Sequence, residues 1–95
     1  MGIMKQLLLT MFIGMVASTA QAGCFADYKA KQDNPLRLHY GLMQLNGPCN
    51  RGAATSEVAD RLMQAGWTLL NVQSVFGPEG LSERKTDAGS YFLRF

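Results

Sequence analysis

Two stretches of the chain alternate between apolar and polar side chains, a pattern typical of half-buried strands. In residues 24–32 (CFADYKAKQ), Ala26, Tyr28 and Ala30 alternate with Asp27, Lys29 and Lys31. In residues 36–42 (LRLHYGL), Leu36, Leu38, Tyr40 and Leu42 alternate with Arg37 and His39. Asp33-Asn34-Pro35 between the two stretches is a cluster of turn-forming residues. The pattern therefore predicts a β-hairpin.

The apolar faces of the two strands set the register expected for this hairpin, because a slip of one residue would exchange the faces. A three-residue loop pairs Gln32 with Leu36, and it then places Tyr28 opposite Tyr40. A two-residue loop would place Lys29 opposite Leu38, so we favour the three-residue loop.

Residues 54–66 (ATSEVADRLMQAG) have the spacing of a helix that buries one face. Thr55 or Ser56 is suited to cap its start, and Asn50 offers an earlier start. Glu57 and Arg61 are spaced for an ion pair on the helix surface. Gly66 is expected to end the helix in a left-handed conformation, with Trp67 folding back onto the last turn.

The remaining segments predict two more strands separated by a loop. Residues 67–76 (WTLLNVQSVF) are expected to form the third strand, residues 77–89 (GPEGLSERKTDAG) a polar hairpin loop, and residues 90–95 (SYFLRF) a fourth, inner strand. The predicted fold is α+β, with order β-β-α-β-β and a four-stranded antiparallel sheet of strand order 1-2-4-3. In this arrangement the helix crosses between the second and third strands as a split β-α-β unit and packs on one face of the sheet. That face is expected to carry Tyr28, Leu38, Tyr40, Leu70, Val72, Tyr91 and Leu93.

Residues 1–22 have the features of a cleaved signal peptide. Lys5 precedes an apolar run at residues 7–16, and Ala20-Gln21-Ala22 fits a cleavage site. The apolar run is too short to span a bilayer, which takes about 20 residues. We therefore expect a periplasmic or secreted protein whose mature part, residues 23–95, is one small domain without a transmembrane segment.

Cys24 and Cys49 are the two cysteines of the chain. In an exported protein an even number of cysteines predicts a disulfide. The alternative is a lipoprotein, because residues 21–24 approach the sequence at which a cysteine is acylated. Gln21 stands where such a sequence has an aliphatic residue, and acylation of Cys24 would leave Cys49 unpaired. The disulfide is therefore favoured.

The charge of the chain does not favour a nucleic-acid partner. Nine Lys and Arg residues, of which Lys5 belongs to the predicted leader, face seven Asp and Glu residues. The mature part is close to neutral, whereas nucleic-acid-binding domains are typically strongly basic.

The sequence contains neither a histidine-based catalytic set, nor a C-x-x-C redox pair, nor a cluster of metal-binding residues. His39 is the only histidine, the cysteines are not in a C-x-x-C arrangement, and the acidic residues form no cluster with histidine. We therefore expect a protein that is not an enzyme and needs no metal or cofactor.

One group of basic side chains is a candidate binding site. In the predicted register the sheet face away from the helix collects Lys29, Lys31, Arg37, His39 and Arg94. Like charges this close together favour an anion or solvent. The resulting hypothesis is a non-catalytic binding or accessory module of the cell envelope, with an anionic envelope component or an acidic protein as partner. The alternative is a small extracytoplasmic enzyme or inhibitor with a cleft at His39, lined by Asp27 and Tyr40.

The spacing Leu62…Gly66-Trp67-x-Leu69-x-x-Val72, followed by Tyr91-Phe92-Leu93-Arg94, resembles a family of small bacterial domains of unknown function. The segments ADYKAK, PLRLHYG, AGWTLLNV and GSYFLRF are similar to a group of short exported bacterial proteins that are also uncharacterised. The resemblance implies a helix that ends in Gly-Trp before a strand, and it implies no catalytic residue.

Overall fold

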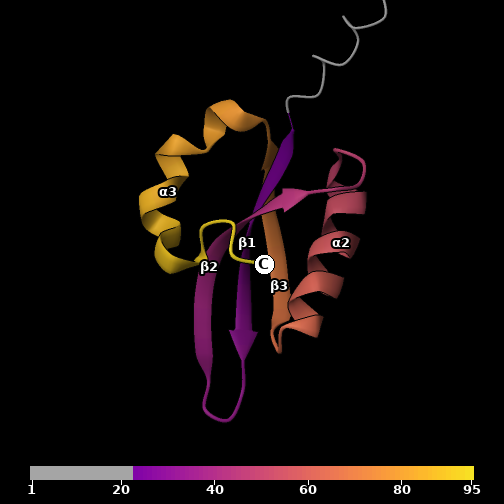
Figure 1. The fold of residues 1–95 in the computed structure, drawn as a ribbon. Helices are drawn as coiled ribbons and strands as arrows, with labels where there is room; N and C mark the ends of the chain where they lie inside the picture. The colour runs from indigo at the N-terminus through magenta and orange to yellow at the C-terminus, as the bar shows by residue number, and fades with distance from the viewer. Residues whose placement is uncertain (1–22) are drawn as a thin grey trace, which may run out of the picture.

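The computed structural model describes residues 23–95 as a three-stranded antiparallel sheet with two α-helices (Figure 1). The strands are β1 (Cys24–Gln32), β2 (Arg37–Leu45) and β3 (Thr68–Phe76), and the helices are α2 (Arg51–Gln64) and α3 (Ser82–Ala88). Two short 3-10 helices, Pro78–Gly80 and Gly89–Tyr91, flank α3. The predicted α+β class is confirmed. The predicted signal peptide, residues 1–22, lies outside the described residues.

The sheet has the order β2-β1-β3, so β1 is its central strand. Within residues 23–95 the predicted fourth strand and the order 1-2-4-3 are not observed. β1 can occupy the centre because Ala26 and Ala30 are small, and because Asp27 is satisfied by side-chain partners when it is buried. β3 therefore pairs directly with β1, across two irregularities in the register.

The hairpin register differs by one residue from the predicted one. Gln32 pairs with Arg37 and Tyr28 with Gly41, so four residues, 33–36, form the turn. The physical reason lies at Gly41, where an added Cβ would come within 2.5 Å of the Tyr28 hydroxyl oxygen. The buried ring of Tyr28 therefore lies against the bare backbone of β2, and Leu36 moves into the turn.

The two faces of the sheet follow from this register, because successive side chains of a strand point to opposite sides. One face, which we call the α2 face, carries Ala26, Tyr28 and Ala30 of β1 together with His39 and Met43 of β2. The other, which we call the α3 face, carries Asp27, Lys29 and Lys31 together with Leu38, Tyr40 and Leu42. Leu38 and Tyr40 were expected under the helix but lie on the opposite face, because the one-residue shift exchanged the sides of β2.

α2 starts and ends at signals that the sequence contains. The Asn50 side chain accepts a hydrogen bond of 2.8 Å from the Ala53 backbone N–H and caps the helix, which confirms the earlier of the predicted starts. At the other end Gly66 has φ +87°, as predicted, and the Trp67 N–H donates to the Leu62 carbonyl at 2.9 Å. Ala54, Val58 and Leu62 face the sheet and pack with Tyr28, Met43 and Trp67 in the core. In the described part of the chain no helix combines the length and the apolar character needed to cross a bilayer.

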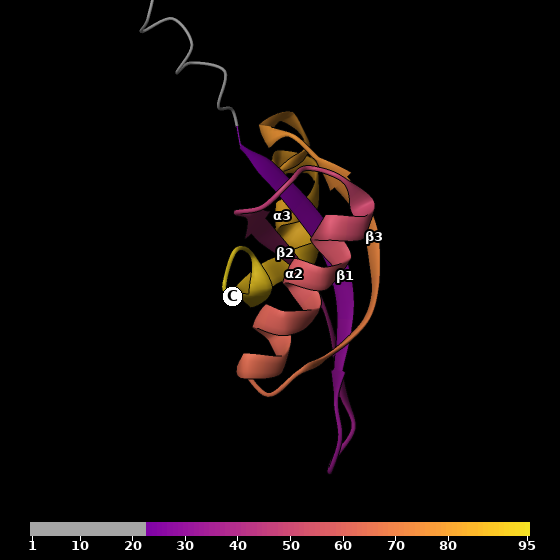
Figure 2. The ribbon, with the colours of Figure 1, turned by 90° about the vertical axis from the view of Figure 1, so that its right-hand side faces the viewer.

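The segment after β3 is helical where a hairpin loop was expected. α3 packs against β2, and its Arg84 contacts both the Phe76 ring at 4.1 Å and the Asp27 carboxylate at 3.3 Å. In Figure 2 α2 lies in front of the strands and α3 behind them. These tertiary contacts stabilise a helix that is too short to form on its own.

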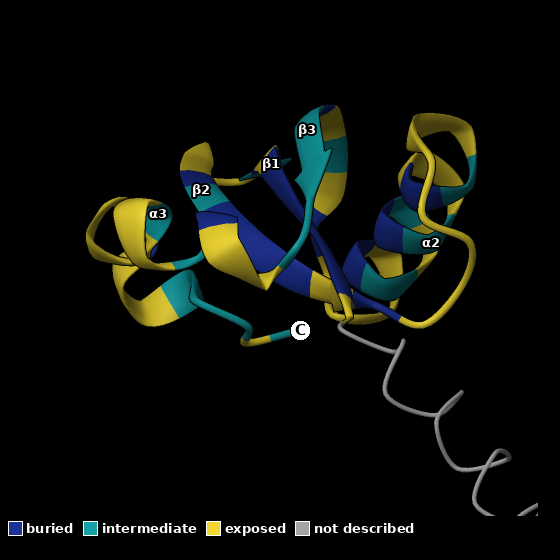
Figure 3. Cartoon of the chain, turned by 90° about the horizontal axis from the view of Figure 1, so that it is seen from above, coloured by how far each residue is buried: buried dark blue, intermediate teal, exposed yellow. Residues whose placement is uncertain are grey.

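Residues 91–95 do not form the predicted inner strand. Phe92 makes a single parallel bridge with Leu42 at the outer edge of β2, where the Leu93 N–H donates to the Leu42 carbonyl at 2.9 Å. The segment therefore lies beside the second strand, as expected, but parallel to it and outside the sheet. Tyr91 and Phe95 pack against the core (Figure 3 shows the burial along the chain).

Candidate functional site

The five basic residues of the predicted anion-binding face are divided between the two faces of the sheet. Lys29 and Lys31 lie on the α3 face, whereas Arg37 and His39 lie on the α2 face. Arg94 is exposed and its guanidinium lies 5.5 Å from the centre of the Tyr91 ring, on the side of His39. The structure therefore brings together the two lysines and does not bring them together with the other three residues.

α3 covers only part of the α3 face. Its contacts reach Asp27, Phe76 and Phe92, while the hairpin end of the sheet extends past α3 (Figure 1). The side chains that this leaves uncovered form what we call the open patch: Lys29, Lys31, Leu38, Tyr40 and Leu70.

A pocket of about 290 Å³ lies in the open patch. Its lining residues are Lys29, Ala30, Leu38, His39, Tyr40 and Leu70. Ala30 and His39 pair with each other and turn their side chains to the α2 face, so their main chain contributes the floor. The walls are apolar or aromatic, and Lys29 is the one residue of the pocket that carries a charge at neutral pH. Lys29 is exposed and forms no ion pair within residues 23–95.

Tyr40, one wall of the pocket, is held in place by a buried carboxylate. Its hydroxyl donates to Asp27 Oδ2 at 2.7 Å, and the Ser74 hydroxyl donates to Asp27 Oδ1 at 2.6 Å. Arg84 Nε lies 3.3 Å from Asp27 Oδ2 and forms an ion pair with the carboxylate. Burial raises the pKa of Tyr40, and the hydrogen bond to Asp27 raises it further, so the phenol stays protonated and keeps donating.

Asp27 is an ionised structural group in this arrangement. Burial alone would raise the pKa of Asp27, but the hydrogen bonds from Ser74 and Tyr40 and the charge of Arg84 bring it below its usual value. A carboxylate with a low pKa and filled hydrogen-bonding positions is a poor general base. Ser74 and Arg84 lie 47 and 57 residues away from Asp27 along the chain, so no local spacing indicates that they are its partners.

His39 lies on the far side of the sheet from Asp27 and Tyr40, in an aromatic enclosure. Its ring stacks on Tyr91 at 3.7 Å, meets Trp67 edge-on at 4.3 Å, and shares a hydrogen bond of 3.0 Å between Nε2 and the Tyr28 hydroxyl. Nδ1 is buried without a partner in the described part of the chain. Burial lowers the pKa of His39, and the nearby Arg94 lowers it further, so the ring is neutral at pH 7.

The cleft that the alternative hypothesis requires is therefore not formed, since His39 lies on one face and Asp27 and Tyr40 on the other. Within residues 23–95 no three His, Cys, Asp or Glu side chains come together as a group that could hold a metal ion.

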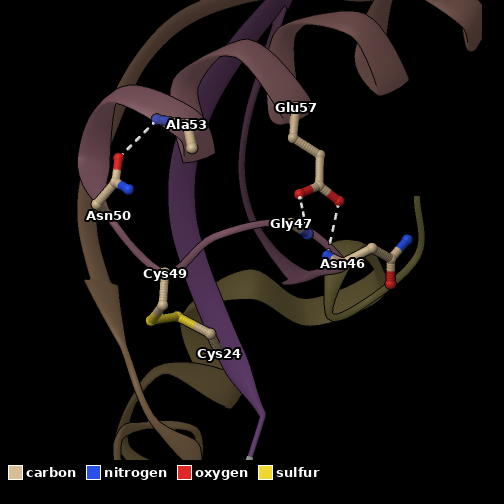
Figure 4. The surroundings of a disulfide bond; sticks show 7 residues. All are labelled: Cys24, Asn46, Gly47, Cys49, Asn50, Ala53 and Glu57. Atoms are coloured by element: carbon tan, nitrogen blue, oxygen red, sulfur yellow. Dashed lines mark hydrogen bonds between the residues drawn. A yellow bond between two sulfur atoms is a disulfide. The ribbon is translucent and has the colours of Figure 1, made fainter.

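The disulfide between Cys24 and Cys49 is confirmed (Figure 4). It joins the start of β1 to the residue before the Asn50 cap of α2. The Glu57 carboxylate accepts hydrogen bonds from the backbone N–H groups of Asn46 and Gly47, at 2.8 and 2.9 Å, and pairs with Arg61 as predicted. Burial would raise the pKa of Glu57, but these backbone donors and Arg61 lower it. Because the disulfide uses the sulfur of Cys24, this sulfur is not free to carry a lipid as the lipoprotein alternative requires.

Comparisons with protein-family models, with curated proteins and with solved structures found no match for this chain. The open patch is therefore interpreted from its own geometry.

Proposed function

We propose that this protein is a non-catalytic binding module of the bacterial cell envelope, and that its open patch contacts an anionic component. The observation that carries the proposal is Lys29, an exposed cation without an ionic partner in residues 23–95, at a pocket whose other walls are apolar or aromatic. Lys31 lies two residues away on the same face and pairs with Asp33 at 3.4 Å, an exposed contact that an anion can replace.

A binding role is supported over catalysis by the state of the titratable groups. Asp27 is engaged by three side chains, and His39 is enclosed on the other face, so neither reaches the pocket with a free acid or base. The extracytoplasmic location is supported by the disulfide, because such bonds persist in oxidising compartments. The features of residues 1–22 and the resemblance to short exported bacterial proteins agree with this location.

The test is a binding titration of the disulfide-bonded protein with three anionic probes: polyglutamate, anionic vesicles and decanoate. We expect the double variant Lys29→Ser/Lys31→Ser to lose most of the binding, and the binding of the wild type to fall with added salt, because exposed charges are screened within roughly 8–10 Å at physiological ionic strength. The matched control is Arg37→Ser/Arg94→Ser, which removes the same charge from the other side and should bind like the wild type. If no probe binds, or if both double variants lose binding equally, the open patch is not an anion site.

A further inference from the structure

The open patch combines its positive charge with exposed apolar side chains. Leu38 and Leu70, two walls of the pocket, are 65% and 49% exposed, and Leu36, at 64%, lies just before β2. Solvated sheet faces usually carry polar residues at such positions. Grouped exposed apolar side chains mark sites of interaction more often than single ones do.

The size of the pocket limits what can fill it. Ligand pockets of proteins typically measure about 300–1,000 Å³, so a pocket of about 290 Å³ takes a short apolar segment. Tyr40 is fixed by its hydrogen bond to Asp27, and the strands on either side are paired with β1, so the pocket is formed before a ligand arrives.

The charge of the patch limits the class of ligand. A bilayer surface or a polyanion is typically bound by a cluster of about four to eight basic residues, whereas this patch offers Lys29 and Lys31, of which Lys31 is paired with Asp33. A second copy of the chain bound through the same patch by a twofold axis would bring the lysines of both copies into one small interface, without an anion to balance them. A protein partner typically covers about 800 Å² on each side, which exceeds a patch of five residues. One negative group joined to one apolar chain matches what the patch presents.

We infer that the open patch binds a single-chain amphiphile, an acyl chain that ends in a carboxylate. The chain lies in the pocket against Leu38, Tyr40 and Leu70, and the carboxylate pairs with the ammonium group of Lys29. This inference rests on the proposed function, since it names the class of anion that the patch takes.

The test is a titration with straight-chain carboxylates of increasing length, from acetate to dodecanoate, below their micellar concentrations. The affinity should rise roughly two- to fourfold for each methylene group that enters the pocket, until the pocket is full. A neutral alkyl glucoside tests the chain without the charge, and it should bind more weakly than the carboxylate of equal chain length. The amide resonances of Lys29, Leu38 and Leu70 should shift during the titration.

The variants separate the two parts of the ligand. Leu38→Ser and Leu70→Ser should remove the dependence on chain length, and both positions are exposed, so the fold is retained. Lys29→Ser should remove the preference of the carboxylate over the glucoside. Met63→Ser is the matched control, because Met63 is 68% exposed and lies on α2, and it should change nothing.

The outcomes distinguish this inference from the proposed function. Lysine-dependent binding that does not change with chain length would overturn the inference and leave the proposed function standing. Binding to anionic vesicles without binding to free carboxylates would overturn it in favour of a membrane surface. Loss of binding in Met63→Ser equal to that in Leu38→Ser would show non-specific adsorption and overturn it as well. Failure of every anionic probe to bind would overturn the proposed function itself.

Discussion

Replacing Asp27 by asparagine should destabilise the protein more than any conservative change on its surface. The carboxylate accepts hydrogen bonds from Tyr40 and Ser74 and pairs with Arg84. Hydrogen bonds to a charged group contribute roughly 1.5–3 kcal/mol each. Asparagine keeps one acceptor oxygen, but it turns an amide N–H₂ toward a hydroxyl donor and leaves Arg84 without its buried partner. Arg84 retains some access to water, so we expect a loss of about 3 kcal/mol in the free energy of unfolding, a large share of the roughly 5–15 kcal/mol of a typical domain.

Urea unfolding followed by circular dichroism measures this loss, and the midpoint should fall by roughly 1–3 M. The matched control is Asp33→Asn, which breaks the exposed pair with Lys31 and should cost about 0.2–1 kcal/mol. The pH dependence of the free energy of unfolding is a second test of Asp27. Because the pKa of Asp27 is lowered in the folded state, its contribution is complete above about pH 4 and is lost as the pH falls through the folded pKa. If Asp27→Asn costs no more than Asp33→Asn, the buried group does not form as described.

Two further predictions concern the α2 side of the molecule. Because the pKa of His39 is lowered in the folded state, the free energy of unfolding should decrease as the pH falls below about 6.5, and His39→Phe should remove this decrease. Urea unfolding at pH 7.5 and 5.5 measures the change. An equal decrease in the variant would show that His39 is not the group that causes it. Gly66→Ala should lower the free energy of unfolding by on the order of 1 kcal/mol, because φ is +87° at Gly66. Gly52→Ala, in the first turn of α2, should raise it by roughly 0.5–1 kcal/mol, because the nearest neighbour of the added Cβ is Asn50 Oδ1 at 3.6 Å. If both substitutions change the free energy of unfolding in the same direction, Gly66 does not end the helix as described.

The elements with strong local signals could be predicted from the sequence. β1 was predicted with its observed bounds, and the helix, its Glu57–Arg61 pair and its end at Gly66 follow from spacings within a few residues. The burial of Trp67 follows in the same way, since a left-handed Gly66 turns the chain back onto the helix. The disulfide was predicted from the number of cysteines. These features depend on contacts between residues that are near in sequence or that have one possible partner.

The register and the strand order could not be predicted, because they depend on how distant side chains fit together. The apolar alternation of Leu38 and Tyr40 indicated a core face, but the space that Tyr28 needs opposite Gly41 shifted the pairing by one residue. That shift moved Leu38 to solvent, placed Tyr40 half-buried on the α3 face and buried His39. The predicted and observed registers therefore differ at residues of β2 that belong to the open patch. The same shift places the residues of the predicted basic cluster on different faces of the sheet.

The structure of the C-terminal part differs from the predicted loop and strand for another reason. Glycine and proline at residues 77–80 indicated a loop, yet α3 follows, held by the contacts of Arg84 with Phe76 and Asp27. The aromatic alternation of residues 91–95 indicated a strand, yet Leu93 has φ +53°, and Tyr91 stacks on His39 instead of joining the sheet.

The position of the disulfide also has a consequence for proteolysis. The bond between Cys24 and Cys49 encloses β1, the turn and β2 in one covalent ring, and the four turn residues, 33–36, are all exposed. Exposed turns are preferred sites of cleavage. A single cut in this turn leaves two fragments that the disulfide still holds together, and the fragment with β1, the central strand of the sheet, stays in place. In a protease-rich compartment the chain then survives as a nicked molecule, which a gel resolves into two pieces only after reduction.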